Sequence, residues 1–278
     1  MRKYKLGLYE KSMPSSLSFE EMFMAGKAAG FDCLEMSVDE TDSRLSRLDW
    51  SKEERKNLLM LSKSLDFSVD SMCLSGHRRF PIGSGNPETE KKGMEIMEKA
   101  IHLAYDMGIR IIQLAGYDIY YDEVSTPSTR ERFMQNLYKS TKMAAANGVV
   151  LALETMENDF MNTVEKAMYF VNNINSPYLK VYPDIGNVTN ATDNVAYDLR
   201  TGKGNIAAIH LKETVPGVFR DMKFGEGRVD FDLAANLMNE LDIRLCTAEF
   251  WYDGGEDWKE QLEKANSFLR GYLDRGIK

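Results

Sequence analysis

The chain has 278 residues and a formal charge of −8, with an isoelectric point near 5.1. This acidic balance repels nucleic-acid backbones and anionic lipid surfaces, so we expect neither a nucleic-acid nor a membrane partner. No stretch approaches the roughly 18 apolar residues of a membrane span, and the first residues lack the apolar run of a signal peptide. We therefore expect a cytoplasmic protein.

Three cysteines are spread widely along the chain, and each lies within an apolar run. They are Cys33, Cys73 and Cys246. An odd number at such distances speaks against a disulfide framework. We expect reduced thiols buried in the core, as is usual for cytoplasmic proteins.

Short apolar runs recur along the chain, and each is followed by a polar loop and a longer segment with helical periodicity. This alternation is typical of βα units around a parallel sheet. The expected strands, in chain order, are Lys5–Tyr9, Cys33–Met36, Ser68–Leu74, Ile109–Ala115, Val149–Glu154, Lys180–Pro183, Ala207–Leu211 and Cys246–Phe250.

The segments between these runs carry helix signals. Ser18 and Ser51 each begin a Ser-x-x-Glu pattern, in which the serine caps the helix and the glutamate bonds back to it. Gly30 and Gly108 stand where helices are expected to end, directly before an apolar strand. Residues 88–108 also repeat apolar side chains at helical spacing, which predicts a face turned toward the core.

Eight strands with intervening helices favour a closed barrel over a doubly wound open sheet. The sequence contains no Pro/Ser-rich linker, low-complexity tract or change of composition that would mark a second domain. The predicted fold class is α/β, a (β/α)8 TIM barrel, with residues 1–278 forming one domain. Functional residues of such barrels lie at the C-terminal ends of the strands.

Four consecutive expected strands end in a potential metal ligand. The run LALE ends in Glu154, VYPD in Asp184, AAIH in His210 and TAE in Glu249. Each of these residues, taken singly, is as well explained as a loop residue or helix cap. Together at one mouth, the carboxylates would repel one another and raise their pKa values unless a cation were bound. We predict that the four residues bind one divalent metal ion.

The ligand types restrict the identity of that metal. Three carboxylates and one imidazole suit Zn²⁺ or Mn²⁺, and the lack of a thiolate speaks against a structural zinc site. We expect one of these two ions as the cofactor. Co²⁺ and Mg²⁺ stay open, because oxygen-rich sites with one histidine also accept them according to supply.

Several long stretches resemble one enzyme family. The stretches are GLYEKSMP, LEMSVDETDSRLSRLDWS, SMCLSGHRRFPIGS, IQLAGYDIYY, VYPDIGN, AIHLKET and FRDMKFGEGRVDF. They resemble the L-ribulose-5-phosphate (L-xylulose-5-phosphate) 3-epimerases of bacterial L-ascorbate and pentose breakdown, within the xylose-isomerase-like barrel superfamily. The resemblance runs from about residue 4 to about residue 252 and implies an isomerase acting on a sugar phosphate.

The resemblance also implies residue roles. In related ketose 3-epimerases a Glu-Asp-His-Glu quartet binds one metal, and its two glutamates transfer protons; the matching positions are Glu154, Asp184, His210 and Glu249. The carbonyl at carbon 2 acidifies the hydrogen on carbon 3, and a metal stabilises the resulting enediolate. Inversion requires protonation from the opposite face. Glu154 and Glu249 are therefore expected to act as base and acid, exchanging roles for the reverse epimer.

A phosphorylated substrate requires local cations on this acidic protein. His77, Arg78 and Arg79 follow the third expected strand, Lys212 follows the seventh, and Arg220 lies in the loop VPGVFRDMKFGEG. Arginine grips phosphate through paired donors, whereas lysine acts as a point charge. The resemblance makes Arg220 the first candidate for substrate contact. The alternatives are pairing of these cations with loop carboxylates and, for His77, a structural hydrogen bond.

Three other functions are alternatives to a sugar-phosphate epimerase. An epimerase or aldose–ketose isomerase acting on an unphosphorylated sugar would keep the same metal ligands. An apurinic-site endonuclease would need more histidines than the three present, and the charge is wrong for DNA. A catalytically silent sugar-binding protein would not need two proton carriers. By analogy with the superfamily, we expect a homodimer.

Overall fold

The structure is a computed structural model that describes residues 2–220 and 222–277. Eight strands form one sheet, and every neighbouring pair is parallel. The strands are β1 (Lys5–Tyr9), β2 (Cys33–Val38), β3 (Ser68–Leu74), β4 (Ile111–Ala115), β5 (Val150–Glu154), β6 (Leu179–Tyr182), β7 (Ile209–Leu211) and β8 (Leu245–Ala248).

Helices follow the strands along the chain. Three short 3₁₀ turns also lie in the described residues: η1 (Glu10–Ser12), η2 (Ser46–Asp49) and η3 (Gly76–Arg78). The α-helices are α1 (Phe19–Ala28), α2 (Asp42–Leu45), α3 (Lys52–Leu65), α4 (Pro87–Met107), α5 (Pro127–Ala146), α6 (Val164–Ile174), α7 (Ile185–Ala191), α8 (Val195–Thr201), α9 (Phe231–Glu240) and α10 (Trp258–Gly276).

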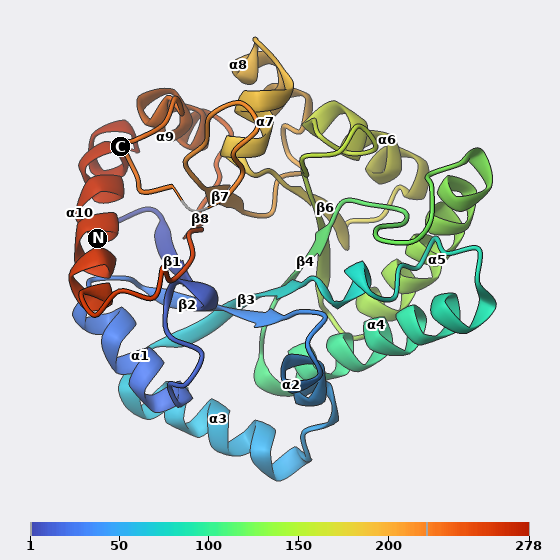
Figure 1. The fold of residues 1–278 in the computed structure, drawn as a ribbon, viewed down its shortest axis with the longest axis horizontal. Helices are drawn as coiled ribbons and strands as arrows, with labels where there is room; N and C mark the ends of the chain where they lie inside the picture. Colours follow the sequence, from blue (N-terminus) through green and yellow to red (C-terminus); the bar gives the residue numbers. More distant parts are fainter. Residues whose placement is uncertain (1, 221, 278) are drawn as a thin grey trace.

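The sheet curls into a nearly closed barrel. Its strand order is β6-β5-β4-β3-β2-β1-β8-β7, so β6 and β7 are its outer members. Parallel bridges from Val181 to Ile206 and from Asp184 to His210 bring these two edges together. Helices surround the strands on the outside (Figure 1). The predicted (β/α)8 TIM barrel is confirmed.

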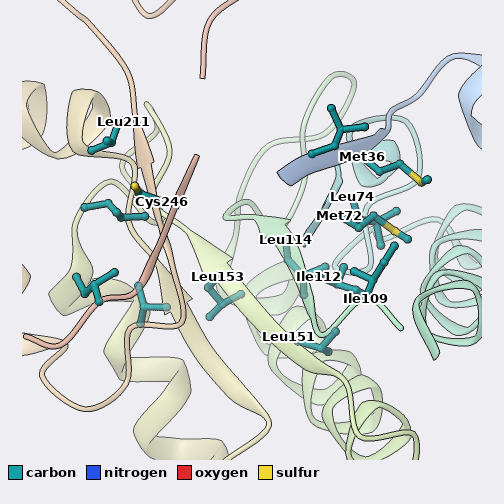
Figure 2. Close-up of a cluster of buried hydrophobic side chains, with 14 of the residues drawn as sticks. Met36, Met72, Leu74, Ile109, Ile112, Leu114, Leu151, Leu153, Leu211 and Cys246 are labelled. Atoms are coloured by element: carbon teal, nitrogen blue, oxygen red, sulfur yellow. The ribbon is translucent and has the colours of Figure 1, made fainter. Parts of the chain in front are cut away.

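The side chains between the strands and the helices form an apolar core. On β4, on β5 and in the last three residues of β3, buried aliphatic or methionine side chains recur at every second residue, as the two-residue period of a strand requires. Figure 2 shows this cluster running from one strand to the next. These side chains are Met72, Leu74, Ile112, Leu114, Leu151 and Leu153.

The barrel interior is polar at one level. Glu35 of β2 accepts hydrogen bonds from Ser71 of β3 and Tyr182 of β6, and it contacts His210 of β7. Tyr182 is also hydrogen-bonded to Thr247 of β8. Side chains from five strands can meet in this way only inside the barrel, so this network lies beneath the mouth where functional residues were expected.

The helix signals in the sequence are largely confirmed. Ser18 and Ser51 both form complete capping boxes, and Gly108 ends α4 with a left-handed φ of 72°. The predicted start of β4 at Ile109 was two residues early. The N–H of Ile109 still donates to the carbonyl of Ala104, because the turn after Gly108 closes the end of α4 before the strand begins.

Two loops meet at the mouth of the barrel. The segment after β2 is held down by Arg47, whose guanidinium donates to both carboxylate oxygens of Glu10 at 2.6 and 2.8 Å. In the loop after β4, the hydroxyl of Tyr121 donates to Glu40 of the first loop at 3.1 Å. Both loops therefore flank the site. Within the described residues, every helix is too short or too polar to span a lipid bilayer.

Candidate metal centre and substrate pocket

The four predicted ligands meet at one point. Glu154 ends β5, Asp184 caps α7 directly after β6, His210 lies in β7 and Glu249 follows β8. One potential ligand atom from each residue lies within 4.8 Å of the others, and all four residues are buried. The backbone holds them in place, because Asp184 bridges to His210 and the N–H of Glu249 donates to Leu211.

His210 lies at the centre of the cluster. Its Nδ1 is 2.6 Å from Glu154 Oε1 and 3.4 Å from Glu249 Oε2, so this nitrogen faces the carboxylates. Its Nε2 points the opposite way and lies 2.6 Å from Glu35 Oε1. The nitrogen available to a metal in this cluster is therefore Nδ1.

Lys212 supplies a positive charge to the same cluster. Its Nζ lies 2.7 Å from Asp184 Oδ2 and 3.5 Å from Glu249 Oε2, and it also lies over the ring of Trp251. Lys212 Nζ also donates a hydrogen bond to the side-chain Oδ1 of Asn187 on α7 at 3.1 Å. The lysine side chain is 8% exposed, so this ion pair is sheltered from water.

The residues present fit a divalent cation. Glu249 Oε2 is buried and accepts no hydrogen bond from any described residue. Its nearest charged partners are His210 Nδ1 at 3.4 Å and Lys212 Nζ at 3.5 Å, so a metal ion held by the quartet would compensate the burial of this oxygen more fully. Three carboxylate ligands and one imidazole nitrogen form a donor set suited to Zn²⁺ or Mn²⁺, and the described cluster holds no thiolate.

Burial and charge shift the pKa values in the cluster. Burial raises the pKa of Glu154, and it raises that of Asp184 to about 6, although the neighbouring Lys212 opposes this. Burial disfavours charged His210, but the carboxylates of Glu35, Glu249 and Glu154 outweigh it and raise the histidine pKa well above its usual value. A proton and a metal would thus compete for Nδ1.

A pocket opens over this cluster. It includes both glutamates of the predicted proton-transfer pair, four cationic side chains, and aromatic walls from the loops. The lining residues are Tyr9, Lys11, Cys73, Ser75, Arg78, Glu154, Met156, Glu157, Asn187, Lys212, Phe219, Arg220, Glu249 and Trp251.

Three of the five predicted substrate-binding residues line this pocket. Arg78, Lys212 and Arg220 do so, with Arg220 placed 5.4 Å from the centre of the Trp251 ring. The Nε of Arg78 is buried without a hydrogen-bond partner among the described residues, and the Nη1 of the same guanidinium lies 3.8 Å from Glu40 Oε2. This guanidinium therefore has unused donor capacity.

The other two predicted residues lie elsewhere. His77 is buried against α4, where its Nε2 is 3.1 Å from the carbonyl of Gly93. Arg79 is half-exposed and pairs with Asp42 at 2.7 Å. The structure thus gives His77 a structural hydrogen bond and Arg79 a surface ion pair, the alternatives that the sequence left open.

Several residues around the site were missed from the sequence. Lys11 follows β1 and reaches the pocket, where it pairs with Asp39 at 2.5 Å. Glu35 and Gln113 contact His210 and Glu154 from inside the barrel. A charged or amide residue in an otherwise apolar strand was the available signal, since LEMSV and IIQLA each contain one.

Comparison with known proteins agrees with this architecture. Residues 23–272 match the family model described as xylose isomerase-like TIM barrel. The chain is 43% identical over 275 residues to L-ribulose-5-phosphate 3-epimerase UlaE of Escherichia coli O139:H28, covering 98% of this chain and 96% of the relative. UlaE of Escherichia fergusonii is similar to the same extent.

Solved structures share the fold at lower identity. The D-psicose 3-epimerase of Clostridium cellulolyticum H10 is similar with a TM-score of 0.81 and 17% identity, covering 97% of this chain and 99% of that one. An L-ribulose 3-epimerase is similar with a TM-score of 0.80 and 20% identity, covering 98% and 95%. At these identities the likeness concerns the barrel alone.

Proposed function

Because the chain belongs to the xylose isomerase-like TIM barrel family and is a sugar epimerase of the UlaE type, we propose that it interconverts L-ribulose 5-phosphate and L-xylulose 5-phosphate by proton transfer at carbon 3. The 43% identical relative is named for the first of these sugars. The observation that carries the proposal is one pocket that combines Glu154 and Glu249 with four cations. In this proposal the enzyme works in the cytoplasm and takes part in the breakdown of L-ascorbate or pentoses.

Glu154 and Glu249 are the proposed proton carriers. They reach the pocket from β5 and from the end of β8, which are separated in the barrel by β6 and β7. One carboxylate removes the proton from carbon 3, leaving an enediolate, and the other, protonated, delivers a proton to the opposite face. The two glutamates exchange these roles for the reverse epimer.

The metal ligands in this proposal are Glu154, Asp184, His210 and Glu249. A divalent ion bound there would supply Lewis acidity to the ketose, which would lower the barrier to proton removal. The protein's own contribution is to hold the two glutamates on either side of the reacting carbon.

The cations of the pocket are the proposed phosphate site. Arg78 offers a buried Nε with no partner among the described residues, and the Ser75 hydroxyl beside it is likewise buried and unpartnered. Lys11 and Arg220 add positive charge to the same pocket. Arginine with a nearby hydroxyl suits a phosphate, which accepts several hydrogen bonds.

A comparison of phosphorylated and free sugars tests the substrate. Two charge-assisted hydrogen bonds to phosphate, at about 1.5 kcal/mol each, correspond to a preference of about 100-fold. We expect kcat/KM for L-ribulose 5-phosphate to exceed that for L-ribulose by at least this factor. Equal values, or turnover of the free sugar alone, would favour an epimerase for unphosphorylated ketoses.

A further inference from the structure

Glu35 is a fully buried carboxylate that the proposed chemistry does not use. It lies on β2 and faces the barrel interior, below the quartet. Its Oε2 accepts hydrogen bonds from Ser71 Oγ at 2.7 Å and from the Tyr182 hydroxyl at 2.9 Å. Its Oε1 lies 2.6 Å from Nε2 of His210. The two oxygens thus have separate partners from three other strands.

This arrangement fixes the orientation of the carboxylate. Because Ser71 and Tyr182 occupy Oε2, Oε1 is left to face the imidazole. Tyr182 is itself held by Thr247 at 3.0 Å, and its ring packs against His210 with the ring centres 4.7 Å apart. The imidazole is therefore clamped by a ring on one side and a carboxylate at one nitrogen, and its other nitrogen points to Glu154.

We propose that Glu35 is the positioning residue of the metal centre: it accepts the Nε2 proton of His210 and so presents the Nδ1 lone pair to the metal. The inference rests on the metal centre of the proposed function. A histidine ligand whose second nitrogen donates to a carboxylate is held in one tautomer and becomes a stronger ligand. Removing such a partner typically weakens metal binding by about 10 to 100-fold.

Metal affinity in three variants tests this role. Glu35→Met removes the acceptor but keeps a side chain of similar length, and Glu35→Gln keeps an acceptor oxygen without the charge. Asp198→Asn is the matched control, because Asp198 is a buried carboxylate whose oxygens accept hydrogen bonds from the N–H groups of Val164 and Glu165 at the start of α6. Titration of metal-free protein with Zn²⁺ and Mn²⁺, followed by calorimetry, measures each dissociation constant.

We expect Glu35→Met to raise the dissociation constant by about 10 to 100-fold and Glu35→Gln by less, with Asp198→Asn unchanged. Equal affinities in wild type and Glu35→Met, both folded by circular dichroism, would overturn the inference and leave the metal centre intact. A wild type that binds neither ion would overturn the metal centre as well as the inference.

A spectroscopic reading separates positioning from a merely structural role. The chain has three histidines, so ¹⁵N-histidine labelling gives a spectrum simple enough to assign. In Zn²⁺-loaded protein we expect a slowly exchanging Nε2–H signal from His210, retained in Glu35→Gln and lost in Glu35→Met. The same signal in Glu35→Met, or an Nδ1–H signal in the wild type, would contradict the proposed tautomer.

Discussion

The ammonium of Lys212 lies 2.7 Å from the carboxylate of Asp184, inside a cluster that also holds two glutamates. The Lys212 side chain is 8% exposed and that of Asp184 is fully buried. Neither charge is solvated by bulk water, so each is stabilised mainly by the other, and removal of one would leave the other buried without a counter-charge. Lys212 and a protonated His210 are the positive charges that balance these carboxylates when no metal ion neutralises them.

The first prediction concerns this ion pair. Lys212→Met leaves Asp184 without its counter-charge, so we expect the metal-free protein to lose about 3 kcal/mol of unfolding free energy. Zn²⁺ should then raise the Tm of the variant by more than it raises that of the wild type. Arg200→Met is the control, because it breaks an exposed pair with Glu240 and should cost less than about 1 kcal/mol.

Thermal unfolding with and without Zn²⁺ measures both effects. If Lys212→Met and Arg200→Met lowered the Tm of the metal-free protein equally, the idea that Lys212 neutralises the cluster would be wrong.

The second prediction concerns the proton carriers. Glu154→Gln and Glu249→Gln should each lower kcat by about 10² to 10⁴-fold, because an amide neither accepts nor returns the proton at carbon 3. Glu226→Gln is the control. Glu226 accepts a bond from the N–H of Lys223 in an exposed turn, so its replacement should leave kcat near the wild-type value. Initial rates with the phosphorylated ketose, at saturating metal, measure kcat for each variant. If the double variant Glu154→Gln/Glu249→Gln kept its activity, these two glutamates would not be the proton carriers.

The third prediction uses two neighbouring arginines. Arg78 lines the pocket, whereas Arg79 pairs with Asp42 on the surface. Arg78→Met should raise KM for the phosphorylated sugar by about 10-fold or more, the value of one charge-assisted hydrogen bond. Arg79→Met should leave KM unchanged. Equal effects of the two substitutions would remove Arg78 from the phosphate site.

The fourth prediction concerns pH and stability. Burial lowers the pKa of His77 from 6.5 to about 4, although its hydrogen bond to Gly93 opposes this. Because the unfolded chain takes up the proton first, the stability that neutral His77 contributes is complete above pH 6.5. It is lost as the pH falls toward about 4, by up to about 3 kcal/mol.

A comparison of variants isolates this contribution. His77→Gln retains a donor for Gly93 but does not titrate, so the stability difference between wild type and variant should shrink as the pH falls from 6.5 to 4. His102→Gln, at an exposed position of α4, should show no such trend. Urea unfolding at several pH values measures this, and a constant difference for His77→Gln would refute the assignment.

The grouping of the four candidate metal ligands was predictable because it depends on local order along the chain. Each of them lies at or just after the end of its own strand, and parallel strands of a barrel bring their C-terminal ends to one mouth. Glu154, Asp184, His210 and Glu249 could thus be grouped without knowledge of any side-chain contact. The strands themselves were located to within one or two residues at most ends, because their apolar runs are short and bounded by polar loops.

The sequence could not show which of the three residues after β3 reaches the pocket. His77, Arg78 and Arg79 are consecutive cationic or titratable side chains in and beside a 3₁₀ turn. Successive residues of such a turn project about 120° apart, so they reach different surroundings. One packs on α4, one reaches the pocket and one meets solvent. Only the orientation of the turn on the barrel decides which is which.

The contact between Glu35 and His210 was also beyond the sequence. The two residues are 175 positions apart and meet across the inside of the barrel. Which strand faces which across the interior depends on the tilt and stagger of all eight strands. Periodicity shows that Glu35 is on one face of β2, and it does not identify the partner on the opposite wall.

The position of isotope incorporation tests the central claim most directly. Metal-loaded protein is incubated with L-ribulose 5-phosphate in deuterated water, and the products are read by NMR. Since one carboxylate removes a proton and the other supplies one from solvent, we predict L-xylulose 5-phosphate with deuterium at carbon 3. Deuterium at carbon 1 instead, or no exchange from protein with metal bound, would contradict a 3-epimerase.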